Sequence, residues 1–283
     1  MPNRRFVKHP IQNLWAVIAP GRLKRPDETG AVGAKLGTGR RPVKPKERKD
    51  PFAPGNEALT PPEVMRIGEG KPDEPGWKVR VVPNKFPIFD LHEVVVLHPE
   101  PLDFGEISDE HAALVFQAYR GRYNTLKSKG LVLIFHNIGR AAGASLKNPH
   151  SQIAVIPREV SPFFEEPPKI ENTVKGTDRF VAFCPEFSQR PYEVWVLRKK
   201  GAKEFGDFDD RELAELATLM NQLMGKMKEV LGKEVPYNFF MRPGRDWHLR
   251  LFPRLTIWGP VELGAGIAVN PVDPAEAARA LRD

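Results

Sequence analysis

An internal repeat is the feature that most limits what this chain can fold into. Residues 192–197 read Tyr-Glu-Val-Trp-Val-Leu and repeat the pattern of residues 92–97, His-Glu-Val-Val-Val-Leu. In both copies this run is followed by an acidic helix start, an amphipathic helix, a strand and a histidine, which is His150 in the first copy and His248 in the second. Because these features recur in the same order, the pattern favours two tandem αβ units over a chance likeness of strands.

Apolar residues at helical spacing predict two long helices. One should begin after Ser108 and the other after Asp209, because both residues begin helix-capping signals. Residues 20–75 are rich in Pro, Gly and Lys and are expected to form a long loop. A Pro-rich link at residues 161–169 separates the units, which we expect to cover residues 1–165 and 166–283. The expected strands are residues 14–18, 77–82, 93–97, 131–135, 152–156, 192–197, 237–241 and 247–251.

The charge of the chain favours an anionic partner. Its formal net charge is +7, with the excess concentrated in residues 22–49. This run is either a solvated basic loop or a means of attracting a phosphorylated small molecule; a nucleic-acid partner is not expected, because aromatic residues are not interleaved with the charges. Cys184 is the single cysteine, which excludes an intramolecular disulfide and a cysteine-rich zinc site. No segment is apolar enough to span a membrane, so we expect a cytoplasmic protein.

The run Asn148-Pro149-His150-Ser151-Gln152 has the composition of a nucleophilic site. Pro149 restricts the backbone before His150, and a neutral imidazole can attack phosphorus while its other nitrogen donates to a carbonyl. Upstream lies a glycine-rich turn suited to cradle an anion, with side-chain donors at Ser145 and Gln152. A lone histidine beside a proline is more often structural, but the whole stretch favours a nucleophile. The turn consists of Asn137, Gly139, Gly143 and Ser145.

Read together, this stretch resembles the active-site region of galactose-1-phosphate uridylyltransferases, which belong to the histidine-triad superfamily and usually carry His-Pro-His-x-Gln. The resemblance spans nearly the whole chain. Its further motifs are Arg4-Arg5, residues 21–26, residues 51–57, residues 81–87, Phe183-Cys184-Pro185, residues 192–195, Trp247-His248-Leu249 and residues 270–282.

The resemblance implies an α+β fold of two tandem histidine-triad-like units, each an antiparallel sheet with flanking helices, and a homodimer. It also implies that His150 attacks the α-phosphorus of a UDP-hexose in a ping-pong cycle, and that a Gln at position 152 marks a transferase where hydrolases have a third histidine. The partners would be a nucleotide sugar and a sugar phosphate. The implied contacts are Gln152, Ser145 and Gly143 to phosphoryl oxygens, Asn84 and Asn137 to the nucleotide, and Arg22 and Arg25 to the incoming phosphate.

Two family metal sites are expected to be lost. The positions that match the structural zinc ligands are Asp50, Ala53, Pro101 and Asn148, of which Ala53 and Pro101 cannot ligate a metal through their side chains. At the second site Arg242 and Arg250 surround His248. We therefore expect no metal cofactor, salt bridges in place of the ions and a structural role for His248. No role is assigned to His92, His98, His111 and His136.

Of the predicted properties, the identity of the substrate is the one that the sequence determines least. The default is transfer of UMP from UDP-glucose to galactose 1-phosphate, with Glu262 as a sugar contact. Residues 258–269 nevertheless match the galactose-binding pattern poorly. The alternatives are a phosphorylase of ADP-glucose or of dinucleoside polyphosphates, which would use the same histidine, and a catalytically silent nucleotide-binding protein. The retained His150, Ser145 and Gln152 argue against the silent protein.

Overall fold

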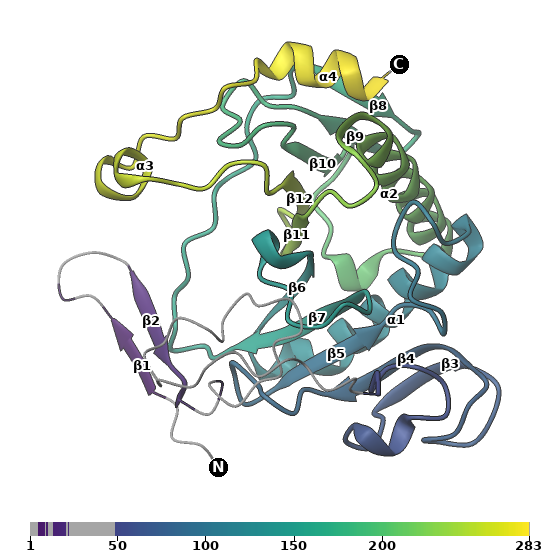
Figure 1. Ribbon diagram of the computed structural model, residues 1–283. Helices are drawn as coiled ribbons and strands as arrows, with labels where there is room; N and C mark the ends of the chain where they lie inside the picture. The colour runs from purple at the N-terminus through teal and green to yellow at the C-terminus, as the bar shows by residue number, and fades with distance from the viewer. Residues whose placement is uncertain (1–4, 9, 11–13, 21, 23–48, 283) are drawn as a thin grey trace.

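The computed structural model describes residues 5–8, 10, 14–20, 22 and 49–282 (Figure 1). Its main element is one antiparallel sheet with the strand order β3-β4-β5-β7-β6-β11-β12-β10-β9-β8. A separate hairpin pairs β1 (Arg5–Lys8) with β2 (Trp15–Ile18). The sheet strands are β3 (Met65–Gly68), β4 (Trp77–Pro83), β5 (His92–Val96), β6 (Leu131–Ile138), β7 (His150–Ile156), β8 (Thr173–Gly176), β9 (Phe180–Phe183), β10 (Val194–Arg198), β11 (Tyr237–Arg242) and β12 (His248–Pro253).

The strand order confirms the repeat. From the central pair β6 and β11 outward, the matching strands are β7 and β12, β5 and β10, β4 and β9, and β3 and β8. In the order along the chain, the long helix of each half follows the same strand: α1 (Asp109–Leu126) comes after β5 and before β6, and α2 (Asp210–Leu231) comes after β10 and before β11. The α+β class with two repeated units, each an antiparallel sheet with a long helix, is therefore confirmed. The two halves of the sheet are joined through β6 and β11, because Tyr237 pairs with Ile138 and Met241 with Ile134.

The two long helices begin where the capping signals predict. The Ser108 side chain accepts from the backbone N–H of His111 at 3.1 Å, and Asp209 forms a full capping box with Glu212 at the start of α2. Both helices pack against each other and against one face of the sheet (Figure 1). The core between the helices and the sheet is formed by apolar side chains such as Phe116, Leu216 and Met220. Burial of this apolar surface is the main stabilising contribution to the fold.

The two-residue period of β7 divides its side chains between two environments. Ile153 and Val155 point to the core under the helices, whereas His150 and Gln152 point to the opposite face. On that face a smaller apolar cluster forms from Phe52, Trp77, Val82, Val94 and Val96. His150 and Gln152 therefore lie on the face of the sheet away from α1.

A buried polar network fixes β7 to the helix side. Ser151, between His150 and Gln152, contacts the Tyr119 hydroxyl and lies 2.8 Å from Nδ1 of His136. Nε2 of His136 lies 3.1 Å from the Asp103 carboxylate, which accepts from the Tyr237 hydroxyl at 2.6 Å. Burial opposes the charge of Asp103, yet its pKa lies below the usual value because His136 and Lys228 stabilise the carboxylate. The network holds the middle of β7 in place.

Several strands lie outside the expected ranges. Strand β3 falls in the expected loop 20–75, and β8 and β9 fall in a stretch to which no element was assigned. The expected strand at 152–156 begins two residues earlier, at His150, and β6 continues to Ile138.

The described residues also include two short helices, α3 (Pro260–Ala265) and α4 (Pro274–Arg282). Among the described residues, no helix has the length and apolar character to cross a membrane.

Candidate active site

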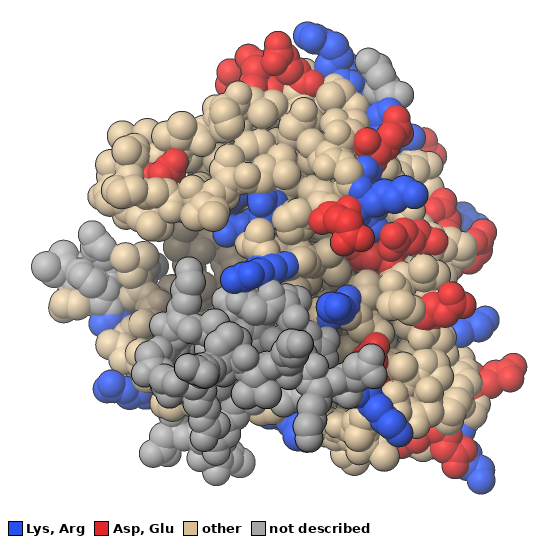
Figure 2. Space-filling view, in the orientation of Figure 1, with Lys and Arg blue, Asp and Glu red and all other residues tan. Residues whose placement is uncertain are grey.

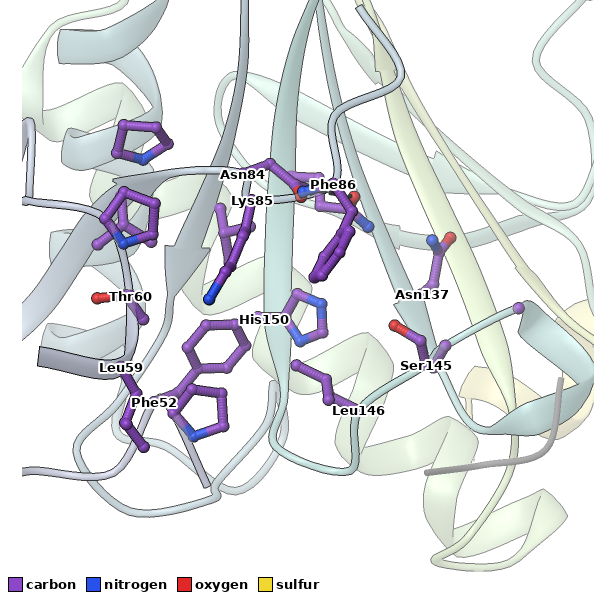
Figure 3. A pocket seen from close by; sticks show the side chains of 18 residues that line it. Phe52, Leu59, Thr60, Asn84, Lys85, Phe86, Asn137, Ser145, Leu146 and His150 are labelled. Atoms are coloured by element: carbon purple, nitrogen blue, oxygen red, sulfur yellow. Dashed lines mark hydrogen bonds between the residues drawn. The ribbon is translucent and has the colours of Figure 1, made fainter. Parts of the chain in front are cut away.

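A pocket of about 360 Å³ opens on the face of the sheet that carries His150 and Gln152. Figure 3 shows His150 at its centre, with Phe52, Leu146 and Phe86 around the ring and Ser145 to one side. The pocket joins residues far apart in the sequence, from the loop before β3, from β4 and β5 and from the turn before β7. Its lining residues are Pro51, Phe52, Leu59, Thr60, Pro61, Val82, Pro83, Asn84, Lys85, Phe86, Val94, Asn137, Gly143, Ala144, Ser145, Leu146, His150 and Gln152.

The imidazole of His150 is held in one tautomer. Its Nδ1 lies 2.8 Å from the backbone oxygen of Asn148. Because a carbonyl oxygen can only accept a hydrogen bond, Nδ1 carries a proton, and in the neutral ring Nε2 carries the lone pair. The side chain is 8% exposed, and its ring centroid lies 5.1 Å from that of Phe52. In its neutral form the ring is therefore an oriented nitrogen base in the lining of the pocket.

The turn before β7 brings backbone groups to the same pocket. Gly139 and Gly143 have φ values of 78° and 80°, in a region that L side chains rarely adopt. Between them lies the short helix η4 (Arg140–Ala142), and the N–H of Ala144 donates back to the oxygen of Gly139 at 3.2 Å. Gly143 and Ser145 line the pocket, as the sequence predicts for an anion cradle.

The predicted nucleotide contacts also lie at the pocket. Asn84 is oriented by the N–H of Phe86, which donates to its Oδ1 at 2.8 Å. Asn137 lines the pocket from β6, and its Oδ1 accepts from the side chain of Asn238 at 2.7 Å. Lys85 belongs to residues 81–87, one of the motifs that carry the family resemblance. Lys85 contributes a cationic side chain to the lining.

The predicted phosphate contact Arg22 and the predicted sugar contact Glu262 are not among the described residues that line the pocket. Arg22 contacts a lining residue, because its Nη1 donates to the backbone oxygen of Phe86 at 2.6 Å. Arg25 and most of the basic run at residues 22–49 lie outside the described residues. Glu262 does not line the pocket of its own chain. It belongs to α3, where its Oε2 accepts from the N–H of Gly259 at 2.9 Å.

At the positions that match the family zinc ligands, a hydrogen bond joins two of the four residues. Nδ2 of Asn148 donates to Oδ2 of Asp50 at 2.7 Å, and Oδ1 of Asp50 accepts from the N–H of Phe52 at 2.9 Å. Ala53 and Pro101 offer no ligating side chain, and an amide beside one carboxylate is a poor donor set for zinc. Over the described part of the chain, no cluster of three or more His, Cys, Asp or Glu side chains could hold a metal. The residues present do not fit a zinc site.

At the second family metal position, around His248, the structure has ion pairs. Arg250 lies 2.6 Å from Glu165 and 2.7 Å from Glu193, and Arg242 lies 2.9 Å from Glu166. Between them, burial lowers the pKa of His248 to about 4, with the positive charges of Arg242 and Arg250 adding to the effect. A histidine surrounded by guanidinium groups does not fit a metal-binding site. The expected salt bridges are present at this position, whereas at the zinc position a hydrogen bond between Asn148 and Asp50 takes their place.

Comparisons with known proteins identify relatives along the whole chain. No family model matches it. The chain is 27% identical to an ADP-glucose phosphorylase of Arabidopsis thaliana over 332 aligned positions, which cover 98% of this chain and 92% of that relative. It is 29% identical to a galactose-1-phosphate uridylyltransferase of Thermotoga maritima over 189 positions, which cover 54% of this chain and 59% of that enzyme.

Solved structures share the fold. The crystal structure of an Arabidopsis thaliana ADP-glucose phosphorylase with bound ADP-glucose has a TM-score of 0.74, at 24% identity and 99% coverage of both chains. A uridylyltransferase structure has a TM-score of 0.68, at 20% identity, and covers 86% of this chain and 93% of its own. The resemblance that the motifs indicated is confirmed by these relatives. The chain is thus similar to enzymes named as a phosphorylase and as uridylyltransferases.

Proposed function

We propose that the protein is a nucleotide-sugar phosphorylase that passes an adenylyl group from ADP-glucose to inorganic phosphate through a covalent intermediate on His150. The observation that carries the proposal is the fixed tautomer of His150, whose Nδ1 proton is bound by the oxygen of Asn148. ADP-glucose is favoured over UDP-glucose because the phosphorylase relative aligns with 98% of the chain, and the Thermotoga maritima uridylyltransferase with 54%.

In the first half of the reaction, the lone pair on Nε2 of His150 forms a bond to the α-phosphorus, and the bond from that phosphorus to the oxygen of glucose 1-phosphate breaks. The leaving group takes the electron pair of that bond. Because a phosphate ester with a second pKa near 6 is a weak base, it leaves without a proton donor. In the second half, an oxygen of inorganic phosphate attacks the same phosphorus, ADP leaves and His150 regains its lone pair.

The remaining lining residues supply binding and charge stabilisation. Donors aimed at the equatorial phosphoryl oxygens stabilise the charge that grows on them in the transition state. Phe52 and Leu146 give the pocket apolar walls suited to a base or ribose. The proposed contacts are Gln152, Ser145 and the backbone at Gly143 to phosphoryl oxygens, Asn84 and Asn137 to the nucleotide, and Arg22 and Arg25 to the incoming phosphate.

A second candidate is transfer of UMP from UDP-glucose to galactose 1-phosphate, favoured by the 29% identity to the Thermotoga maritima enzyme. Both reactions use the same histidine and differ in the base and in the acceptor. Turnover of ADP-glucose and of UDP-glucose, each with phosphate and with galactose 1-phosphate, separates them. We expect kcat/KM for ADP-glucose with phosphate to exceed the other pairs by about 10-fold or more. Preference for UDP-glucose with galactose 1-phosphate selects the second candidate, and no turnover of either donor overturns both.

We also propose that the protein acts as a homodimer. The arm at residues 255–269, which includes α3, exposes large apolar side chains: Ile257 is 93% exposed and Leu263 73%. Figure 2 shows few charged side chains over this arm, at the upper left. A second copy would cover this apolar surface. Analytical ultracentrifugation should find a dimer, which Ile257→Asp combined with Leu263→Asp should dissociate. A monomeric wild-type protein would contradict the proposal.

A further inference from the structure

His92, to which the sequence assigned no role, lies directly beside the proposed phosphate-binding residue Gln152. His92 is the first residue of β5 and is 3% exposed. It pairs with Ala154 of β7, while Gln152 pairs with Val94. Because side chains alternate along both strands, His92 and Gln152 project from the same face of the sheet.

The tautomer of His92 follows from its hydrogen bonds. The backbone N–H of Ile88 donates to Nδ1 of His92 at 2.9 Å. Since Nδ1 must accept this bond, the ring proton of the neutral imidazole lies on Nε2. That Nε2 lies 3.0 Å from Oε1 of Gln152, so His92 donates to the amide oxygen of Gln152.

Asn84 supports the same orientation of Gln152. Its Oδ1 accepts from the N–H of Phe86, so its Nδ2 is the end that approaches Gln152, at 3.5 Å from Oε1. Nδ2 also lies 3.4 Å from Nε2 of His92. Both of these nitrogens carry protons, so they converge as donors on one acceptor rather than bonding to each other.

We propose that His92 is a positioning residue, which binds the amide oxygen of Gln152 and so turns the amide nitrogen toward the phosphoryl group of the substrate. This inference rests on the proposed function. The two ends of a glutamine amide have nearly the same shape but opposite polarity. If the oxygen faced the pocket, it would repel the phosphoryl oxygens instead of donating to them. The bond from His92 to Oε1 excludes that orientation.

Two substitutions of His92 separate this role from a structural one. His92→Gln places an amide nitrogen where Nε2 lies and keeps a donor to Gln152. His92→Asn places an amide group where Nδ1 lies, so it keeps an acceptor for the N–H of Ile88 but removes the donor to Gln152. If His92 only anchored the loop at Ile88, the Asn variant would be the better tolerated of the two.

The test compares kcat, KM and the melting temperature of both variants with ADP-glucose and phosphate. We expect His92→Asn to lower kcat by about 10-fold to 100-fold with less than about 3-fold change in KM, and His92→Gln to recover most of the loss. In a Gln152→Ala background, His92→Asn should change kcat by less than about 2-fold further, because both substitutions remove the same interaction.

Equal loss of kcat in the two variants, or a full additional loss in the Gln152→Ala background, would overturn the assignment of His92 while leaving the proposed function intact. A wild-type protein that turns over neither nucleotide sugar would overturn the proposed function, and the role of His92 with it. If His92→Asn lowers the melting temperature, single-turnover kinetics at a temperature where both variants remain folded supply the same comparison.

Discussion

Nδ1 of His150 donates to the backbone oxygen of Asn148 at 2.8 Å, while the side chain of Asn148 donates to Asp50 at 2.7 Å. One residue thus orients the proposed nucleophile through its backbone and ties the segment before β7 to the loop at Asp50 through its side chain. This is the position where the family resemblance leads one to expect a metal-binding histidine. In this protein a hydrogen bond joins the two segments.

The stability of the protein should depend on the charges of the two side chains in the hydrogen bond between Asn148 and Asp50. Asn148→Asp sets a carboxylate against the carboxylate of Asp50 and should lower the free energy of unfolding by about 2 kcal/mol. Combining it with Asp50→Asn reverses donor and acceptor and should restore most of the loss. Urea denaturation of the single and double variants measures both effects. A double variant no more stable than Asn148→Asp would show that this pair does not hold the two segments together.

Chelation should leave the enzyme unchanged. The residues at both family metal positions pair with one another as hydrogen bonds or ion pairs and do not form a suitable ligand set. Activity and melting temperature should therefore be the same before and after exhaustive treatment with EDTA and 1,10-phenanthroline. Stoichiometric zinc or iron by elemental analysis, lost together with activity, would contradict this account of Asp50 and Asn148.

A negative charge at position 152 should slow the reaction. Gln152→Glu keeps the size of the side chain and an oxygen able to accept from His92, but it replaces the amide donor by a carboxylate oxygen. Repulsion of the phosphoryl oxygens should lower kcat by about 100-fold or more. Steady-state kinetics measure this loss, and an unchanged melting temperature serves as the control for folding. Near wild-type kcat would remove Gln152 from the proposed site.

His248 should make the fold sensitive to acid. Its pKa is lowered to about 4 in the folded protein, against 6.5 as the ordinary value. Between these values the unfolded chain binds a proton that the folded chain does not, so the free energy of unfolding should fall as the pH falls from 6.5 toward 4. The loss should reach at most about 3 kcal/mol. Urea denaturation between pH 8 and pH 4 should show a shallower dependence for His248→Gln than for the wild type; identical slopes would refute the assignment.

The sequence predicted those parts of the fold and site whose signals are local. The helix caps at Ser108 and Asp209 and the β-branched runs of β5 and β10 depend on neighbouring residues, and the turn at Gly143 requires a positive φ. The edge strand β3 was missed, because all four residues of Met65–Gly68 are at least partly exposed and a glycine ends the strand.

Contacts across the sheet could not be read from the sequence. His136 and His92 lack a neighbouring motif, and their roles arise only where β5, β6 and β7 meet Asp103 and Gln152. The joining of the two halves of the sheet also depends on pairing between β6 and β11, which lie about one hundred residues apart. The resemblance to known enzymes supplied the chemistry, whereas the hydrogen bonds that orient His150 and Gln152 required the structure.

The central claim is that His150 carries the nucleotidyl group, and intact-mass analysis tests it most directly. The protein is incubated with ADP-glucose without phosphate, quenched in alkali because a phosphohistidine-type bond is labile in acid, and digested to locate the modification. The account predicts one added adenylyl group on His150, no adduct in His150→Gln and a normal adduct in His248→Gln, the matched histidine of the repeat. An adduct on another residue, or none from either ADP-glucose or UDP-glucose, would contradict it.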